Sequence, residues 1–151
     1  MEFEIKKLAE KYNINYIILR FFNIFGIGQS SEYAGVITKF MKKIEMNKSL
    51  EIFGDGMQTR DFVSIKDIVN SIYDAMKNGK NGTYNVASGK GITIKKLAEL
   101  MISLSKKDLK IIYIDTKKGD IRFSEADISL AKNELQYLPK YGVENVKNLL
   151  N

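Results

Sequence analysis

An unbroken apolar run near the amino terminus places the tightest limit on the fold of this chain. Residues 16–22 read Tyr-Ile-Ile-Leu-Arg-Phe-Phe, and a helical pattern over residues 2–12 precedes them. A continuous run of β-branched and aromatic residues is typical of a strand that is buried on both faces and has neighbouring strands. Few other segments of the chain are apolar enough to flank it. The sequence therefore predicts the later part of a larger sheet whose first strands are absent.

Strand and helix patterns alternate along the rest of the chain, which predicts an α/β fold. Thr93 is a good N-cap for one of the helices. A loop is expected over residues 23–33, and Pro139 follows the last helix. Strands are expected at 50–53, 60–65, 83–87 and 110–114, and helices at 36–46, 66–77, 94–105 and from residue 127.

The composition excludes several kinds of chemistry. The chain has no cysteine and no histidine, so disulfides, thiolate zinc sites, cysteine nucleophiles and the usual general base are excluded. No apolar run approaches the roughly 18 residues that cross a bilayer. The first residues lack the apolar core of a signal peptide. We expect a cytoplasmic protein with no membrane partner and no metal.

The net charge of +6 comes from 24 basic and 18 acidic residues. A basic chain can bind nucleic acid, a membrane surface or an acidic small molecule. The plainer interpretation is that the lysines are spread over the surface and are solvated. Aromatic and basic residues are not interleaved as they are on single-strand-binding surfaces, so no nucleic-acid partner is expected.

The first of three polar clusters lies at the end of the apolar strand. Phe21 and Phe22 are followed by Asn23, and then by Gly26. In open α/β sheets, ligands bind beyond the carboxyl ends of the strands. The alternative is an ordinary strand end with a turn asparagine.

The second cluster runs from Leu50 to Phe62. Its glycine pair, Gly54 and Gly56, allows a turn with positive φ. Arg60 then follows, and a planar guanidinium can grip a phosphate with two parallel hydrogen bonds. The alternative is a surface pair of Arg60 with Asp61 after a hairpin, which would contribute little.

The third cluster, residues 117–122, places basic side chains around a Gly-Asp turn. It reads Lys-Lys-Gly-Asp-Ile-Arg and is followed by Ala-Asp-Ile-Ser at 126–129. Such a turn can meet an anion, although taken alone it reads more simply as a solvated loop.

Together and in this order, the clusters resemble the extended short-chain dehydrogenase family of NAD-dependent sugar-nucleotide epimerases and dehydratases. The Gly-Asp-Gly-x-x-x-Arg-Asp-Phe segment at 54–62 is the most specific signal, and Tyr-Asn-Val-Ala-Ser-Gly at 84–89 supports it. The resemblance covers essentially the whole chain. Tyr33-Ala34-Gly35-Val36-Ile37 favours the UDP-glucose 4-epimerase branch.

The resemblance implies a Rossmann-type fold joined to a small α/β substrate domain. Residues 1–30 would be the tail end of the dinucleotide-binding domain, and residues 31–151 mostly the nucleotide-sugar-binding domain. Phe21 and Phe22 would lie near the nicotinamide of NAD. The nucleotide-sugar would be held by Asn23, Val36, Ile52, Phe53, Arg60, Lys117 and Asp120.

Within that set, the resemblance implies particular roles. Ile52 and Phe53 would hold the base, Arg60 would bind the diphosphate, and Lys117 stands where the family usually has an arginine. Lysine keeps the charge but lacks the bidentate fork.

Two family motifs are missing from the sequence. The glycine fingerprint Gly-x-x-Gly-x-x-Gly does not occur, and no Tyr-x-x-x-Lys stands at a suitable place; in the family that pair would fall just before Met1. The resemblance thus implies a part of an NAD-dependent enzyme that is inactive alone. It would associate with a missing N-terminal half or form a homodimer. A non-catalytic nucleotide-sugar-binding module and a part of a dTDP-sugar 4,6-dehydratase remain as alternatives.

Overall fold

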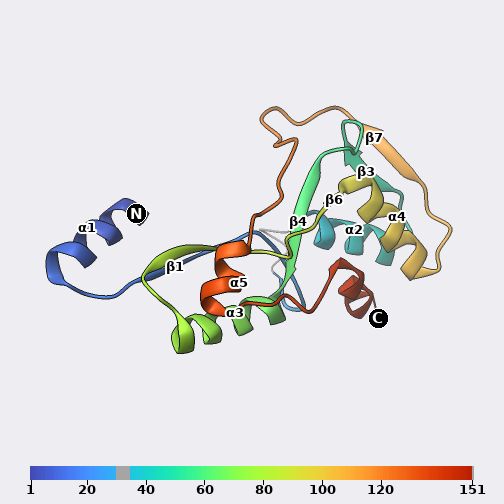
Figure 1. The fold of residues 1–151 in the computed structure, drawn as a ribbon. Coiled ribbons are helices and arrows are strands. Elements are labelled where there is room, and N and C mark those ends of the chain that lie inside the picture. The colour runs from blue at the N-terminus through green and yellow to red at the C-terminus, as the bar shows by residue number, and fades with distance from the viewer. Residues whose placement is uncertain (30–34, 151) are drawn as a thin grey trace.

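The computed structural model describes residues 1–29 and 35–150, and it has the expected α/β architecture (Figure 1). The helices are α1 (Glu2–Tyr12), α2 (Val36–Glu45), α3 (Ile65–Asn78), α4 (Ile94–Ser105), α5 (Ser129–Leu135) and the 3₁₀ helix η1 (Val143–Leu149). The strands are β1 (Ile17–Phe21), β2 (Asn23–Phe25), β3 (Leu50–Phe53), β4 (Thr59–Ser64), β5 (Gly82–Val86), β6 (Gly91–Thr93) and β7 (Ile111–Ile114).

Strand β4 is the centre of the arrangement. The first half of β4 pairs antiparallel with β6, with Arg60 opposite Ile92. Its second half pairs parallel with β2, with Phe62 opposite Asn23. Parallel pairs β1–β5 and β3–β7 lie apart from this three-stranded sheet. Strand β4 therefore pairs with both β2 and β6, and its residues belong to both hydrophobic clusters of the described structure.

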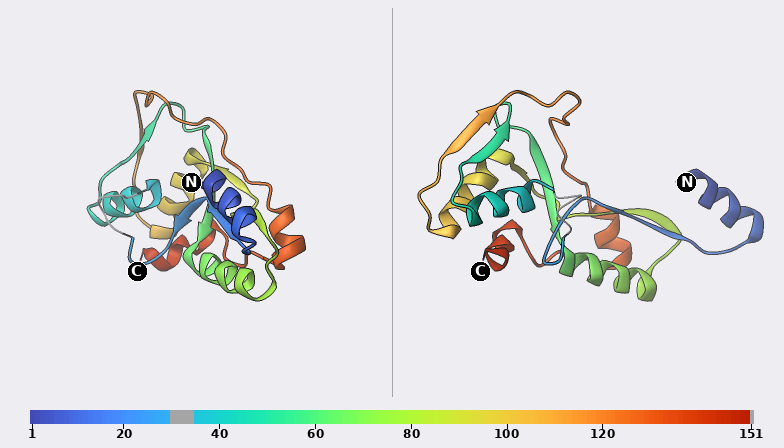
Figure 2. Two further views of the ribbon diagram at one scale, coloured as in Figure 1. Left: turned by 90° about the vertical axis from the view of Figure 1, so that its left-hand side faces the viewer. Right: turned by 180° about the vertical axis from the view of Figure 1, so that it is seen from behind.

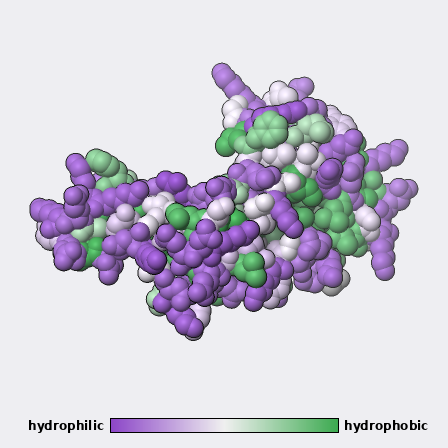
Figure 3. Space-filling model, viewed as in Figure 1, coloured by the Kyte–Doolittle hydropathy of each residue, from purple (hydrophilic) through white to green (hydrophobic). Residues whose placement is uncertain are grey.

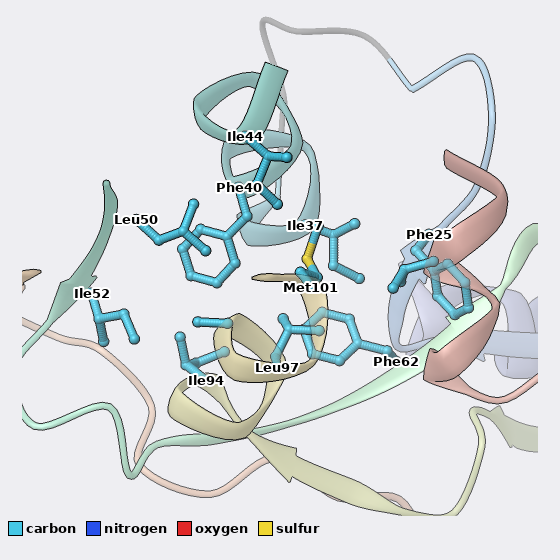
Figure 4. Packing of buried hydrophobic residues seen from close by; sticks show 12 residues of the cluster. Phe25, Ile37, Phe40, Ile44, Leu50, Ile52, Phe62, Ile94, Leu97 and Met101 are labelled. Atoms are coloured by element: carbon cyan, nitrogen blue, oxygen red, sulfur yellow. The ribbon is translucent and has the colours of Figure 1, made fainter. Parts of the chain in front are cut away.

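Two hydrophobic clusters lie against β4, and each belongs to a separate lobe. The cavity lobe comprises α2, β3, α4, β7 and η1, and its cluster packs around Phe62 (Figure 4). The two-strand lobe comprises β1, β5, α3 and α5, and its cluster packs around Val63. Because neighbouring strand residues point to opposite faces, adjacent residues of β4 supply both cores.

Short polar caps explain where two of the helices begin. Thr93 Oγ1 accepts a hydrogen bond from the Lys96 amide at 3.2 Å, which confirms the predicted N-cap of α4. Ser64 Oγ accepts one from the Lys66 amide at 3.3 Å at the start of α3. Strands β4 and β6 thus run straight into helices through hydroxyl caps.

The two-strand lobe and α1 leave much apolar surface uncovered. Residues of α3 at helical spacing form an exposed stripe: Ile65, Val69, Ile72, Tyr73 and Met76. Helix α1 stands apart from the body and buries only Ala9, while Phe3, Leu8 and Tyr12 are exposed (Figure 2). Apolar atoms reach the surface at the α1 end of the molecule (Figure 3).

Several expectations from the sequence prove wrong in detail. Strand β1 is not buried on both faces: Arg20 and Phe21 are exposed, because within residues 1–29 and 35–150 β1 pairs with β5 alone. Residues 23–25 form β2 instead of a loop, and β3 and β4 do not pair as a hairpin. Short β6 and the carboxyl-terminal η1 were not predicted. Both are brief elements that gain their stability from packing and pairing rather than from a local pattern.

None of the helices within the described residues is both long and apolar enough to cross a membrane.

Candidate functional site

A cavity of about 430 Å³ opens in the cavity lobe between α2, β3, β4 and the segment after β7. Seven of its lining residues are those predicted for substrate binding: Asn23, Val36, Ile52, Phe53, Arg60, Lys117 and Asp120. They come from β2, α2, β3, β4 and the segment after β7, and the fold brings them to one cavity. Phe21 and Phe22 do not line it; Phe21, at the end of β1, is 41% exposed.

Strand β3 builds one wall of the cavity by alternation. Leu50 and Ile52 are buried, while Glu51 and Phe53 point outward. The strand ends at Gly54 and Gly56, whose φ angles of +64° and +73° suit glycine. A Cβ on Gly56 would lie 3.2 Å from Ile52 Cγ2, so a side chain at this position would be crowded as well as strained.

Arg60 lies at the polar end of the cavity, and its guanidinium is already oriented. It forms an ion pair with Asp120 and donates to the Ile121 carbonyl oxygen at 2.5 Å. The Arg60 side chain is only 16% exposed. The alternative of a surface pair between Arg60 and Asp61 is wrong, since Asp61 is fully buried and faces elsewhere.

Residues 115–124, which we call the strap, cross the mouth of the cavity. The strap carries Lys117 and Asp120. Arg122 fixes it from outside by a bidentate ion pair with Asp55, at 2.7 and 2.8 Å, which holds the pKa of that carboxyl well below its usual range. The Thr59 amide donates to the Arg122 carbonyl oxygen at 2.9 Å. The third sequence cluster is therefore exposed but tied down at several points.

A buried carboxylate, which the sequence did not single out, organises the floor behind Arg60. Asp61 accepts hydrogen bonds from the amides of Ser88, Gly89 and Ala126 at 2.8, 3.0 and 3.2 Å, and from the Ser88 hydroxyl at 2.6 Å. Asn23 Nδ2 donates to the Asp61 carbonyl oxygen at 3.0 Å. The place of Asp61 in the Gly-Asp-Gly-x-x-x-Arg-Asp-Phe segment was the available signal.

Gln58 is a second residue that sequence reasoning missed. It lines the cavity, is only 7% exposed, and its Nε2 donates to the Phe53 carbonyl oxygen at 2.9 Å. Lys39 on α2 adds a further positive charge to the wall. Of the segment that suggested the UDP-glucose 4-epimerase branch, Tyr33 and Ala34 lie outside the described residues.

The cavity can bind an extended anionic molecule with an aromatic or apolar end. Ile52, Phe53 and Val36 supply apolar contacts to this cavity, and Arg60 and Lys117 supply positive charge. Among the described residues, no three His, Cys, Asp or Glu side chains gather into a group that could hold a metal ion.

The fold and this site define an α/β protein whose cavity is lined by apolar and by positively charged side chains. The profile of the NAD dependent epimerase/dehydratase family matches residues 1–87, which is more than half of the 151 residues. The chain belongs to this family, as the motifs of the three clusters indicated.

Three proteins show how far the similarity extends. A putative UDP-glucose 4-epimerase of Methanocaldococcus jannaschii is 34% identical over 97% of this chain. The structure of a UDP-glucose 4-epimerase with UDP-glucose, from Thermotoga maritima, superposes with a TM-score of 0.92 at 32% identity over 97% of this chain. A UDP-glucuronic acid 4-epimerase from Bacillus cereus, in complex with UDP-glucuronic acid and NAD, gives a TM-score of 0.85 at 27% identity over 95%.

The chain spans about half the length of these relatives. It covers 48% of the Methanocaldococcus protein, 48% of the Thermotoga structure and 46% of the Bacillus structure.

Proposed function

We propose that this chain supplies the nucleotide-sugar-binding part of an NAD-dependent sugar epimerase or dehydratase, with a UDP-sugar as ligand. The observation that carries the proposal is the convergence of all seven candidate residues on one cavity with paired positive charge at one end. The bound UDP-sugars of the two similar structures support the ligand class.

Each part of the cavity suits one part of such a ligand. The base would lie against β3 at Ile52 and Phe53, with Val36 opposite. The diphosphate would meet Arg60, whose guanidinium is already held in place by Asp120 and so loses little freedom on binding. Lys117 would give a second positive charge, although an ammonium group lacks the bidentate geometry of a guanidinium. Asn23 would hydrogen-bond the sugar.

The residues of this chain fit NAD only in part. Phe21 and Phe22 could contact a nicotinamide at the end of β1. Within residues 1–29 and 35–150, however, the two strands that run directly into helices do so through Ser64 and Thr93 and not through a glycine-rich turn. A dinucleotide pyrophosphate needs such a turn for close backbone approach. We therefore derive no hydride-transfer step from these residues.

The uncovered apolar surface of α1, β1 and α3 supports a further part of the proposal. This surface includes the exposed apolar stripe of α3 and the edge of β1 that is unpaired within the described residues. Such a surface favours the binding of another protein segment that covers it. We propose that the cofactor-binding portion of the family, or a second copy of the chain, packs there. Residues 1–30 would then belong to the dinucleotide-binding domain and the remainder mostly to the nucleotide-sugar domain.

Calorimetry with UDP-glucose tests the binding role. Saturable binding is expected, and Arg60→Ala should weaken it by about 2 kcal/mol or more, roughly 30-fold in Kd, because a charge-assisted contact is lost. Arg20→Ala is the matched control, since Arg20 is an exposed arginine paired with Glu2 outside the cavity. An unchanged Kd for Arg60→Ala would remove Arg60 from the site. Tighter binding of dTDP-glucose than of UDP-glucose would favour the dehydratase alternative.

We expect no epimerase activity from this chain alone with NAD added, because its sequence offers neither the glycine fingerprint nor a suitably placed Tyr-x-x-x-Lys. The measurement is the conversion of UDP-galactose to UDP-glucose in a coupled assay. Measurable turnover would refute the expectation. Binding without turnover agrees equally with a non-catalytic nucleotide-sugar-binding module, and recovery of activity on adding the cofactor-binding half of a relative would decide against that module.

A further inference from the structure

A second cavity, of about 630 Å³, opens beside β6 and is separate from the one described above. We call it the lysine cavity. One wall is formed by residues 88–93, which are β6 and the turn before it, and another by the first turn of α4. The third is the segment 138–144, which leads from α5 into the start of η1. Phe62 of β4 lines both cavities. The volume falls within the range of small-molecule sites, about 300–1,000 Å³.

The charge of the lining is strongly one-sided. Lys90, Lys96, Lys132 and Lys140 line this cavity, and Glu144 is the single carboxylate among the lining residues. Within the described part of the chain, none of these four ammonium groups takes part in an ion pair. Positive charges that converge on one hollow repel one another, and a bound anion would relieve that repulsion.

Buried carboxylates hold both walls in place. Asp61 binds the amides of Ser88 and Gly89, as described above, and so fixes the turn before β6. Asp67 is 1% exposed and accepts hydrogen bonds from the amides of Lys140 and Tyr141, both at 3.0 Å. These backbone donors occupy the carboxylate oxygens. Lys90 and Lys140 thus stand at or beside backbone that is fixed before any ligand arrives, and Lys96 and Lys132 stand on helices α4 and α5.

An aromatic and aliphatic surface adjoins the lysines. Tyr141, Leu138 and Pro139 come from one wall and Ile92 from the other. Lys66 Nζ lies 5.1 Å from the centroid of the Tyr141 ring, which restrains that ring. The first amides of α4 are already bonded, Ile94 to the Gln58 carbonyl oxygen and Lys95 to that of Gly56, so lysine side chains and not helix amides would contact an anion.

The geometry points to a second ligand site, for a small organic phosphate whose phosphate meets the lysines and whose apolar part lies against Tyr141. This site does not depend on the proposed nucleotide-sugar function. Of the two aromatic residues that line the cavity, Phe62 is only 5% exposed, which leaves Tyr141 to stack on a ligand. This arrangement does not suit single-stranded nucleic acid, which needs a succession of stacking rings along a groove.

The test uses phenyl phosphate and methyl phosphate as matched probes, followed by amide chemical shifts of the full ¹⁵N-labelled chain. Phenyl phosphate should bind saturably, more tightly than methyl phosphate, and should shift the amides of Lys90, Gly91, Tyr141 and Gly142. Tyr141→Ala should abolish the difference between the two probes. The double variant Lys96→Ala, Lys132→Ala should weaken phenyl phosphate about tenfold.

A second double variant, Lys6→Ala with Lys77→Ala, removes two exposed lysines outside the cavity and should leave the Kd within about twofold. Arg60→Ala should also leave it unchanged, because Arg60 belongs to the other cavity. The proposal would be overturned if both lysine double variants weakened phenyl phosphate binding equally, or if only Arg60→Ala abolished binding. It would also be overturned if the four amides showed no saturable shift.

Discussion

The two lobes on either side of β4 differ in how much of their apolar side-chain surface is buried. In the cavity lobe, α2 and α4 turn their apolar faces inward, and Leu97 and Met101 are completely buried. In the two-strand lobe, α3 buries Asp67 and Ser71 and exposes Ile72 and Met76. The cavity lobe thus reads as complete, whereas the two-strand lobe and α1 present apolar surface to solvent. The same contrast predicts which substitutions the chain should tolerate.

A matched pair of leucines tests the comparison with the largest expected effect. Leu97→Ala should destabilise the chain by about 2–5 kcal/mol, because Leu97 is fully buried in α4 and its removal leaves a void. Leu8→Ala in α1 should change stability by less than about 0.5 kcal/mol, since Leu8 is 49% exposed. Urea unfolding followed by circular dichroism measures both. Comparable losses for the two leucines would mean that α1 is packed in solution and would break the comparison.

Asp61→Ala should have the next largest effect, about 3 kcal/mol, because it leaves one buried and three part-buried donors without this acceptor. It lies where the lobes meet, so both should lose stability together. Asp108→Ala, an exposed carboxylate between α4 and β7, is the control, and thermal unfolding is the measurement. Loss of only one lobe's amide protection would show that Asp61 does not join them.

Arg122→Ala should have the smallest effect, confined to the strap of the cavity lobe. Binding of UDP-glucose should weaken about threefold, because Lys117 and Asp120 lose one of their anchors. Arg122 lowers the pKa of Asp55, so this tie is present above the ordinary pKa of Asp55 and is lost as the pH falls through its lowered folded value. Calorimetry at neutral pH is the measurement. A 30-fold loss, as expected for Arg60→Ala, would make Arg122 a direct ligand contact.

The sequence predicted the longer elements of the fold because their signals are local. Helix α4 begins at its predicted Thr93 cap, and α1, α2 and β3 lie at or within a residue of the expected positions. Strands β2 and β6 are three residues each and depend on pairing with β4. Their existence follows from tertiary contacts that no local pattern encodes.

The candidate site was predicted through family motifs rather than through physical pattern. All seven substrate residues line one cavity, although what they bind stays a prediction. From residue types alone, Arg60 could equally grip a phosphate or pair with Asp61 at the surface, and residues 117–122 read more simply as a solvated loop. What decided otherwise was the approach of residues about 60 positions apart, Arg60 and Asp120, which spacing along the chain cannot reveal.

Tyr84 illustrates a further long-range contact of this kind. Its hydroxyl donates to Glu134 Oε2 at 2.7 Å, and burial together with this carboxylate raises the pKa of Tyr84 to about 12. The bond ties β5 to α5 across the two-strand lobe.

Strand β4 has a consequence for how the chain opens. Phe62 faces one core and Val63 the other. Along the same strand, residues 59–61 pair with β6 and residues 62–64 pair with β2. Loosening of either lobe leaves β4 held by the other, so the hydrogens of its amides should exchange with solvent only when the whole chain unfolds. The lobes differ in how well they are covered, but because they share this one strand we expect them to unfold in a single cooperative transition.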